Sequence, residues 1–171
     1  MAILRFNFYG VGVEVESDWD DVLSLLGKDF SFFKANSLND KSKKKLIKLK
    51  VFQKDPHVVF IPEICSSMQT LNSITYQVGD VRYNDYYGKL TSVLNYKVEQ
   101  GEIYSSDLDK THEVAYLFIL SRVGKKLDLM GLHKLHAFAV AYKGVAIVCM
   151  MPMKGGKSTL MLELLKNPDV R

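Results

Sequence analysis

The segment from residue 137 to residue 164 constrains the fold of this chain more than any other part of the sequence. Two apolar runs, AFAVAY and VAIVCM, surround a turn signal at Lys143-Gly144, and a glycine-rich loop, MPMKGGKS, and the apolar run TLMLELL follow them. Continuous apolar runs are typical of central strands that are covered on both faces. The order strand, turn, strand, glycine-rich loop and helix therefore predicts the opening of an α/β domain. We place its boundary near residue 130 and expect two domains, 1–130 and 131–171.

The loop ends in a pattern that is typical of phosphate-binding loops. Residues 156–159, GKST, match the end of the pattern G-x-x-x-x-G-K-[ST], whereas Met151 stands where that pattern has its first glycine. Free N–H groups and the dipole at the start of a helix favour an anion there. We expect Lys157 to reach the phosphates of ATP and Ser158 to coordinate Mg²⁺; an ordinary turn ahead of a helix is the alternative. The predicted nucleotide-binding residues are Lys154, Gly155, Gly156, Lys157, Ser158 and Thr159.

Residues 130–167 resemble the start of the kinase domain of the HPr serine kinase/phosphorylase family, with a P-loop that departs from the family pattern at Met151 and Met153. His136 matches the histidine ahead of the family's first strand, and Gly144 matches its hairpin turn. The resemblance implies an ATP- and Mg²⁺-dependent serine/threonine protein kinase that acts on a protein substrate. It makes His136 a candidate for a phosphate or catalytic contact; a structural histidine at the start of a strand is the alternative.

The family's acidic pair, which serves as metal ligand and catalytic base, has no counterpart in this sequence before Arg171. The resemblance therefore implies an N-terminal fragment of such a kinase, which binds nucleotide and does not catalyse. The rival hypothesis is a non-catalytic interaction or regulatory module with a degenerate loop. In that case the first 130 residues would bind a partner or a second copy of the chain. The contacts would come from Tyr83, Tyr86 and Tyr87 and from the lysine-rich stretch Lys41 to Lys50.

The first 130 residues predict an α+β domain with an antiparallel sheet and two helices. Residues 3–17 read as two strands joined at Gly10 to Gly12, and residues 73–106 as three or four antiparallel strands. The turn signals between those later strands are Gly79-Asp80, Asn84-Asp85, Gly88 and Gln100-Gly101. Helical spacing of apolar residues predicts helices from Asp18 to about Lys34 and from Leu108 to about Val123. Ser106 or Asp107 would cap the second helix, and Gly124 would end it.

Two further segments have weaker patterns. Residues 36–45 read as a polar loop, and the lysine-rich stretch Lys41 to Lys50 as a solvated approach to an edge strand, where lysines discourage aggregation. The apolar residues between Pro56 and Pro62 predict a short strand.

Composition excludes several classes of protein. The net charge of +4 suits an anionic ligand, but the lysines lack the interleaved aromatics of a nucleic-acid surface, so we expect no nucleic-acid partner. The two cysteines form neither a disulfide framework nor a metal spacing. No apolar run approaches the roughly 20 residues of a membrane helix, and the N-terminus does not read as a signal peptide. We therefore expect a cytoplasmic protein with no membrane partner.

Overall fold

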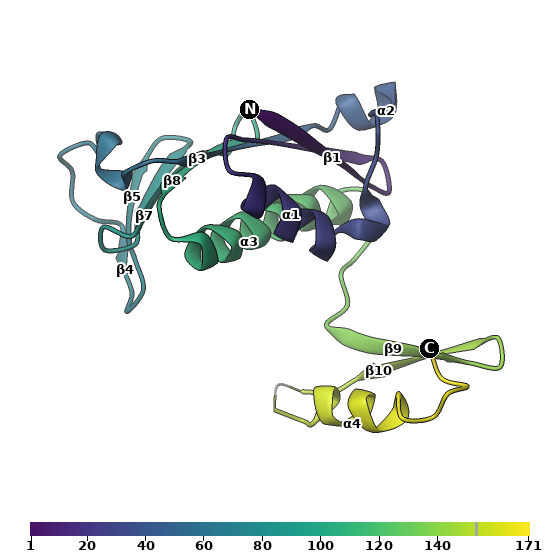
Figure 1. The fold of residues 1–171 in the computed structure, drawn as a ribbon. Coiled ribbons are helices and arrows are strands. Elements are labelled where there is room, and N and C mark those ends of the chain that lie inside the picture. The colour runs from purple at the N-terminus through teal and green to yellow at the C-terminus, as the bar shows by residue number, and fades with distance from the viewer. Residues whose placement is uncertain (153) are drawn as a thin grey trace. The chain divides into compact units, whose positions relative to one another are not determined.

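The computed structural model describes residues 1–152 and 154–171, and the chain forms two compact units, Met1–Gly131 and Leu132–Arg171 (Figure 1). The first unit is an α+β fold built on an eight-stranded sheet in the order β1-β2-β3-β8-β7-β6-β5-β4. Its strands are β1 (Ala2–Phe8), β2 (Val11–Ser17), β3 (Ile47–Gln53), β4 (Met68–Gln69), β5 (Ile74–Val78), β6 (Val81–Asp85), β7 (Leu90–Asn95) and β8 (Gln100–Ser105). The predicted antiparallel sheet is confirmed for most pairs, but β3 runs parallel to both β2 and β8.

The position of β3 corrects the prediction of an edge strand after the lysine-rich stretch. β3 lies in the middle of the sheet, between β2 and β8. Its residues alternate strictly: Ile47, Leu49 and Val51 are fully buried, while Lys48 and Lys50 are exposed. The lysines therefore mark an uncovered sheet face and not an edge, because a central strand of a one-sided sheet presents every second side chain to water.

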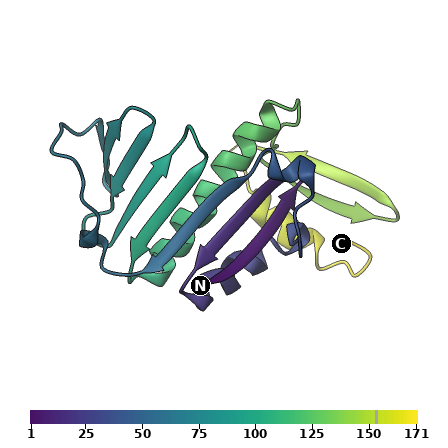
Figure 2. The same ribbon diagram turned by 90° about the horizontal axis from the view of Figure 1, so that it is seen from above.

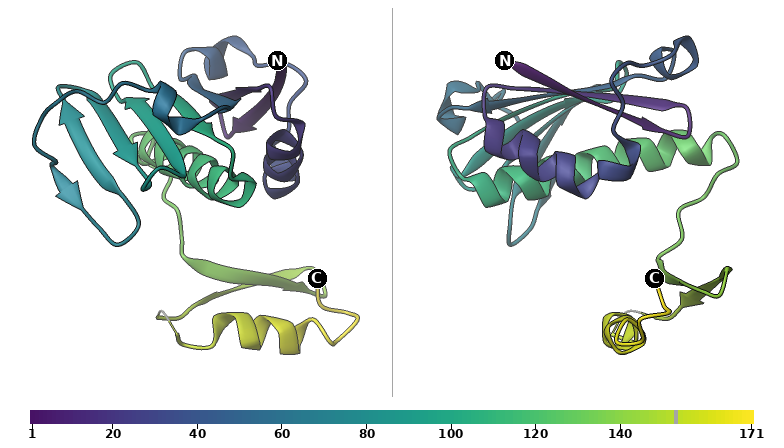
Figure 3. Two further views of the ribbon diagram at one scale, coloured as in Figure 1. Left: turned by 60° about the vertical axis from the view of Figure 1, so that its left-hand side comes forward. Right: turned by 45° about the vertical axis from the view of Figure 1, so that its right-hand side comes forward.

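Helices α1 (Asp20–Asp29) and α3 (Leu108–Asp128) cover the other face of this sheet (Figures 2 and 3). They contact each other through stacked rings of Phe30 and Tyr116, whose centroids are 5.2 Å apart, and through a 2.6 Å contact between His112 Nε2 and Asp29 Oδ2. The core lies between these helices and strands β1, β2, β3, β7 and β8. Its largest fully buried side chains include Phe6, Leu26, Ile47, Leu49, Leu90, Ile103 and Ile119.

The helix boundaries differ from the predictions at three points. Asp107 caps α3 as expected, accepting a hydrogen bond from Lys110 N at 3.0 Å, but Gly124 is buried inside the helix, which continues to Asp128. The first helix ends at Asp29, and residues 31–33 form a separate 3-10 turn. The stretch that was predicted as a polar loop contains a short helix, α2 (Asp40–Lys43), which Asn39 caps.

The turn signals had mixed outcomes. Gly79-Asp80 joins β5 to β6, as predicted. The turn between β1 and β2, predicted at Gly10 to Gly12, falls at Tyr9 and Gly10, which both have positive φ, and Gly12 lies inside β2. Asn84-Asp85 lies inside β6 instead, where Asn84 is buried. Residues 56–58 form a 3-10 turn and not a strand.

Gly101 was predicted as part of a turn, but it lies inside β8 beneath helix α3. A Cβ at this position would lie 3.0 Å from Phe118 Cζ and 3.1 Å from Leu49 Cδ1 and Leu94 Cδ2. Close packing therefore favours glycine here, because these three side chains would have to shift to admit a Cβ. The turn between β7 and β8 falls at residues 96–99.

We expect Gly101→Val to lower the free energy of unfolding by about 1–3 kcal/mol, the range for overpacked cores. Urea denaturation of the full chain measures it. The matched control is Lys48→Val, which places the same side chain on the uncovered face of the neighbouring strand and should change stability by less than about 0.5 kcal/mol. Equal effects of the two substitutions would contradict the packing argument.

The second unit consists of β9 (Ala137–Tyr142), β10 (Val145–Met150) and α4 (Lys157–Leu164). Lys143 and Gly144 form the predicted two-residue turn, with φ values of 49° and 79° that suit a tight hairpin. The chain end pairs with the other side of β9, through two backbone hydrogen bonds between Ala141 and Arg171. Since both neighbours run antiparallel to β9, residues 170–171 run parallel to β10, with α4 as the crossover.

The prediction that residues 145–150 form a strand covered on both faces is wrong for this chain. β9 is the one strand paired with β10 in the described part of the chain, and Val145, Val148 and Met150 are 63%, 55% and 69% exposed. Helix α4 packs against β9 and has no buried residue. Across both units, no helix among the described residues is both long enough and apolar enough to span a membrane.

Candidate functional site

The glycine-rich loop connects the end of β10 to the start of α4. Gly155 N donates to Pro152 O at 3.0 Å, which closes a tight turn. Lys154 and Gly156 both have left-handed backbone, with φ values of 64° and 83°. Gly156 is the N-cap of α4, and its carbonyl accepts the first helical bond from Leu160 N at 2.9 Å. Since the Gly155 N–H is already bound to Pro152 O, the donors that the loop offers to an anion are the N–H groups in the first turn of α4.

The two adjacent glycines are needed for different reasons. Any side chain at Gly155 would place its Cβ 2.9 Å from the Pro152 carbonyl oxygen, which belongs to the backbone and cannot rotate away. At Gly156 the space is open, with no heavy atom within 4 Å of an added Cβ, but the φ of 83° strains any residue other than glycine. The loop conformation thus depends on both positions.

A pocket of about 410 Å³ lies over this loop; we call it the loop pocket. It brings together all of the residues that the sequence named for the site, from two segments of the unit. They are His136, Lys154, Gly155, Gly156, Lys157, Ser158 and Thr159. Two ammonium groups, an imidazole and the start of a helix line the pocket, and no carboxylate is among its lining residues. Its electrostatics favour an anion.

Lys157 holds the loop in its present shape. Its Nζ donates to Met151 O at 2.7 Å and to Pro152 O at 3.1 Å, so the ammonium lies across the first residues of the loop. These two carbonyl oxygens were not anticipated from the sequence, because backbone acceptors leave no residue signature. Met151 therefore contributes through its backbone, which any residue provides. Met153, the other departure from the family pattern, lies outside the described residues.

The residues present fit a phosphate group better than they fit a metal ion. Backbone N–H groups, a helix start and two lysines are the donors that phosphates take. Ser158 lines the loop pocket, but no group of three or more His, Cys, Asp or Glu side chains among residues 1–152 and 154–171 could hold a metal.

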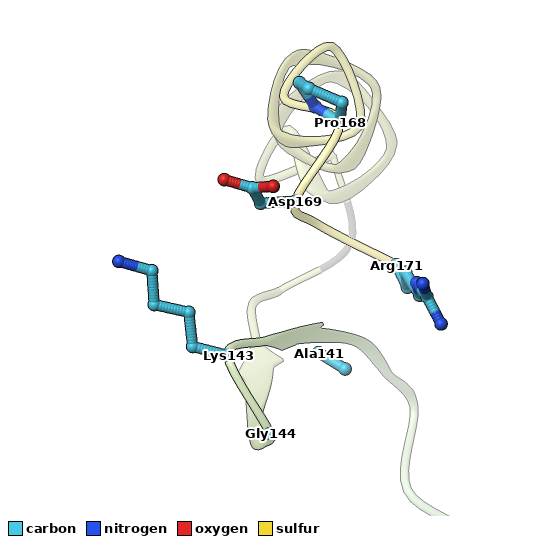
Figure 4. A pocket seen from close by; sticks show the side chains of 6 residues that line it. All are labelled: Ala141, Lys143, Gly144, Pro168, Asp169 and Arg171. Carbon is cyan, nitrogen blue, oxygen red and sulfur yellow. The ribbon is translucent and has the colours of Figure 1, made fainter.

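A larger hollow of about 480 Å³ lies at the β9–β10 turn and is less suited to a ligand. It is lined by Ala141, Lys143, Gly144, Pro168, Asp169 and Arg171. Figure 4 shows the Lys143 and Arg171 side chains extending in opposite directions, so the two cations do not converge on one point. The loop pocket is the better candidate because its lining combines two lysines, a histidine and the first residues of α4.

The three tyrosines that the alternative hypothesis assigns to an interaction surface do not lie together on one face of the unit. Tyr83 lies on the uncovered face of β6, since it alternates with the buried Asn84. Tyr86 lies near α3, with Lys110 Nζ 5.3 Å from its ring centroid. Tyr87 OH donates to Thr70 O at 2.6 Å. The three side chains thus point to different surroundings, which removes one argument for a shared docking surface.

Comparisons of this chain with protein-family models, with curated proteins and with solved structures find no match.

Proposed function

We propose that the loop pocket binds the phosphates of a nucleotide, ATP with Mg²⁺, and that the 132–171 unit belongs to an ATP-dependent serine/threonine protein kinase of the HPr kinase type. The observation that supports it best is the convergence of His136 and residues 154–159 on one pocket at the start of α4. Lys157 is the central group, since its ammonium already lies on the loop backbone and can turn to a phosphate oxygen from there.

In this proposal the chain binds nucleotide without transferring a phosphoryl group. Phosphoryl transfer needs a residue that orients or deprotonates the acceptor hydroxyl, and it needs metal ligands on the far side of the phosphate. The loop pocket offers His136 and two lysines, with no carboxylate among its lining residues. ATP should therefore remain intact on this chain, and a carboxylate supplied from elsewhere would complete the site.

Calorimetric titration with Mg·ATP tests the proposal, with Gly155→Ala as the informative variant. The added Cβ would lie 2.9 Å from Pro152 O, so the loop backbone must shift and its N–H groups must move away from the phosphates. We expect binding to weaken about tenfold, the equivalent of 1.4 kcal/mol. Ala139→Gly, on β9 of the same unit, is the control for general loosening of the fold. Absence of saturable binding by the unaltered chain would overturn the proposal.

A further inference from the structure

We propose that the 1–131 unit binds a small aromatic carboxylate in a hollow between strands β6 and β7 and helix α3, with Arg82 as the anion-binding group. The hollow has a volume of about 220 Å³, and we call it the arginine pocket. Two cross-strand pairs form its floor: Arg82 opposite Leu94, and Asn84 opposite Ser92. It lies in the other unit from the loop pocket, so the proposal is independent of the nucleotide site.

The floor of the arginine pocket breaks the apolar pattern of the helix-covered sheet face. Under the helices that face carries residues such as Val13, Leu49 and Ile103, all fully buried. On β5, β6 and β7 it carries Thr75, Asn84 and Ser92 instead, of which Ser92 is fully buried and the other two nearly so. Thr75 Oγ1 donates to Asn84 Oδ1 at 3.0 Å, and Asn84 Nδ2 donates to Ser92 Oγ at 3.0 Å. A satisfied chain of this kind fixes a polar floor in one geometry.

The two arginines of the pocket have different electrostatic surroundings. Arg122 forms a double hydrogen bond with the Glu99 carboxylate, at 2.7 and 2.8 Å, which balances its charge. Arg82 donates its Nε–H to the neutral amide oxygen of Gln77 at 3.0 Å and makes no ion pair within the part of the chain that the structure describes. Both guanidinium groups also approach the Tyr96 ring, at 5.1 Å for Arg82 and 4.7 Å for Arg122. The surroundings of the pocket are therefore net positive, since Glu99 is shared by Arg122 and Lys126, and Arg82 is the arginine whose charge no nearby carboxylate pairs among the described residues.

The wall opposite the floor is apolar, and it therefore favours a ligand with an apolar ring. Val114, Leu117, Phe118 and Ser121 follow one another at helical spacing along α3, so one face of this helix borders the pocket. Burial raises the pKa of Tyr86, with the Glu113 charge and Tyr96 adding to the effect, so its hydroxyl keeps its proton and can donate. The pocket is smaller than the roughly 300–1,000 Å³ of sites for drug-sized ligands. A single ring with one carboxylate matches its size, its apolar wall and the charge of Arg82.

NMR titration of the ¹⁵N-labelled full chain with sodium benzoate tests this inference, with neutral benzamide as the matched probe. We expect saturable shifts of amides in β6, β7 and the middle of α3 with benzoate, and at least about tenfold weaker binding of benzamide, because the charge-assisted bond to Arg82 is lost. Shifts confined to the loop at 154–159, or equal binding of the two probes, would overturn the inference.

Three variants make the test specific to the pocket. Arg82→Gln should weaken benzoate binding about tenfold or more and abolish the preference over benzamide. Leu117→Glu, at a side chain that is 53% exposed, should also weaken it by placing a negative charge at the apolar wall. Lys48→Gln removes the same charge as Arg82→Gln from the uncovered sheet face and should leave binding unchanged. Benzoate binding that survives Arg82→Gln in a folded protein would rule the pocket out.

Discussion

Lys157→Ala is expected to weaken Mg·ATP binding by about 10- to 150-fold, the range that a lost charge-assisted hydrogen bond gives. In the free protein Lys157 Nζ is held by Met151 O at 2.7 Å and Pro152 O at 3.1 Å, within the lining of the loop pocket. A bound phosphate would attract this ammonium more strongly than two neutral carbonyl oxygens do. Calorimetry with Mg·ATP, and with pyrophosphate as a smaller probe, measures the loss.

Lys166→Ala is the matched control for this variant. Lys166 lies just beyond α4 and pairs with Glu163 at 2.7 Å, far along the helix from its N-terminus. Its removal changes the net charge equally and should change nucleotide binding less than about twofold, since screened surface charges act weakly at such separations. If both variants bind Mg·ATP as the unaltered chain does, the loop does not hold phosphate, and the kinase proposal falls with it.

The sequence predicted the positions of helices, strands and turns better than it predicted which elements pack against one another. The hairpin turn at Lys143-Gly144 was identified because such turns favour particular residues, and the first turn was predicted at Gly10 to Gly12, near its actual place at Tyr9-Gly10. The cap at Asp107 was identified for a similar local reason. By contrast, Gly101 and Gly124 were taken for turn and stop signals, although both lie inside elements and are buried. Gly101 is favoured by the packing of Phe118, Leu49 and Leu94 against it, and such a reason leaves no signal in the local sequence.

The candidate site could be predicted for the same local reason. Its lining comes from a continuous segment, residues 154–159, and one histidine just ahead of β9. The arginine pocket could not be found in this way, because Arg82, Ser92 and Leu117 lie far apart in the sequence and meet only through strand register and helix packing. The same limit explains why β3 was predicted as an edge strand. Its parallel pairing with β8 joins segments about fifty residues apart, and its alternating lysines do not show which strands lie on either side of it.

Glu99→Gln is expected to lower the free energy of unfolding at pH 7 by about 1–3 kcal/mol, because Arg122 loses the charged acceptor of a partly buried pair. The Arg122 side chain is 8% exposed and the Glu99 side chain 14%, and Lys126 Nζ lies 3.5 Å from the same carboxylate. Glutamine keeps the size of the side chain, but it removes the charge and leaves one acceptor oxygen for Arg122 in place of two. Urea denaturation measures the loss.

Glu113→Gln is the control, because Glu113 pairs with Lys110 in a more exposed ion pair. This substitution should lower the free energy of unfolding by less than about 1 kcal/mol.

The effect of Glu99→Gln should disappear in acid, and the sign of the pKa shift gives the direction. Burial alone would raise the pKa of Glu99, but the hydrogen bonds from Arg122 and the charges of Arg122 and Lys126 outweigh it and lower the pKa below 4.5. A carboxyl whose pKa is lowered on folding contributes its full stability above the unfolded value, and loses it as the pH falls through the folded value. The difference in unfolding free energy between the unaltered chain and Glu99→Gln should therefore be constant from pH 7 to about pH 5 and shrink below pH 4.5. A difference that stays the same in acid would mean that the carboxylate charge does not stabilise the fold and that Arg122 is held by its contact with Tyr96.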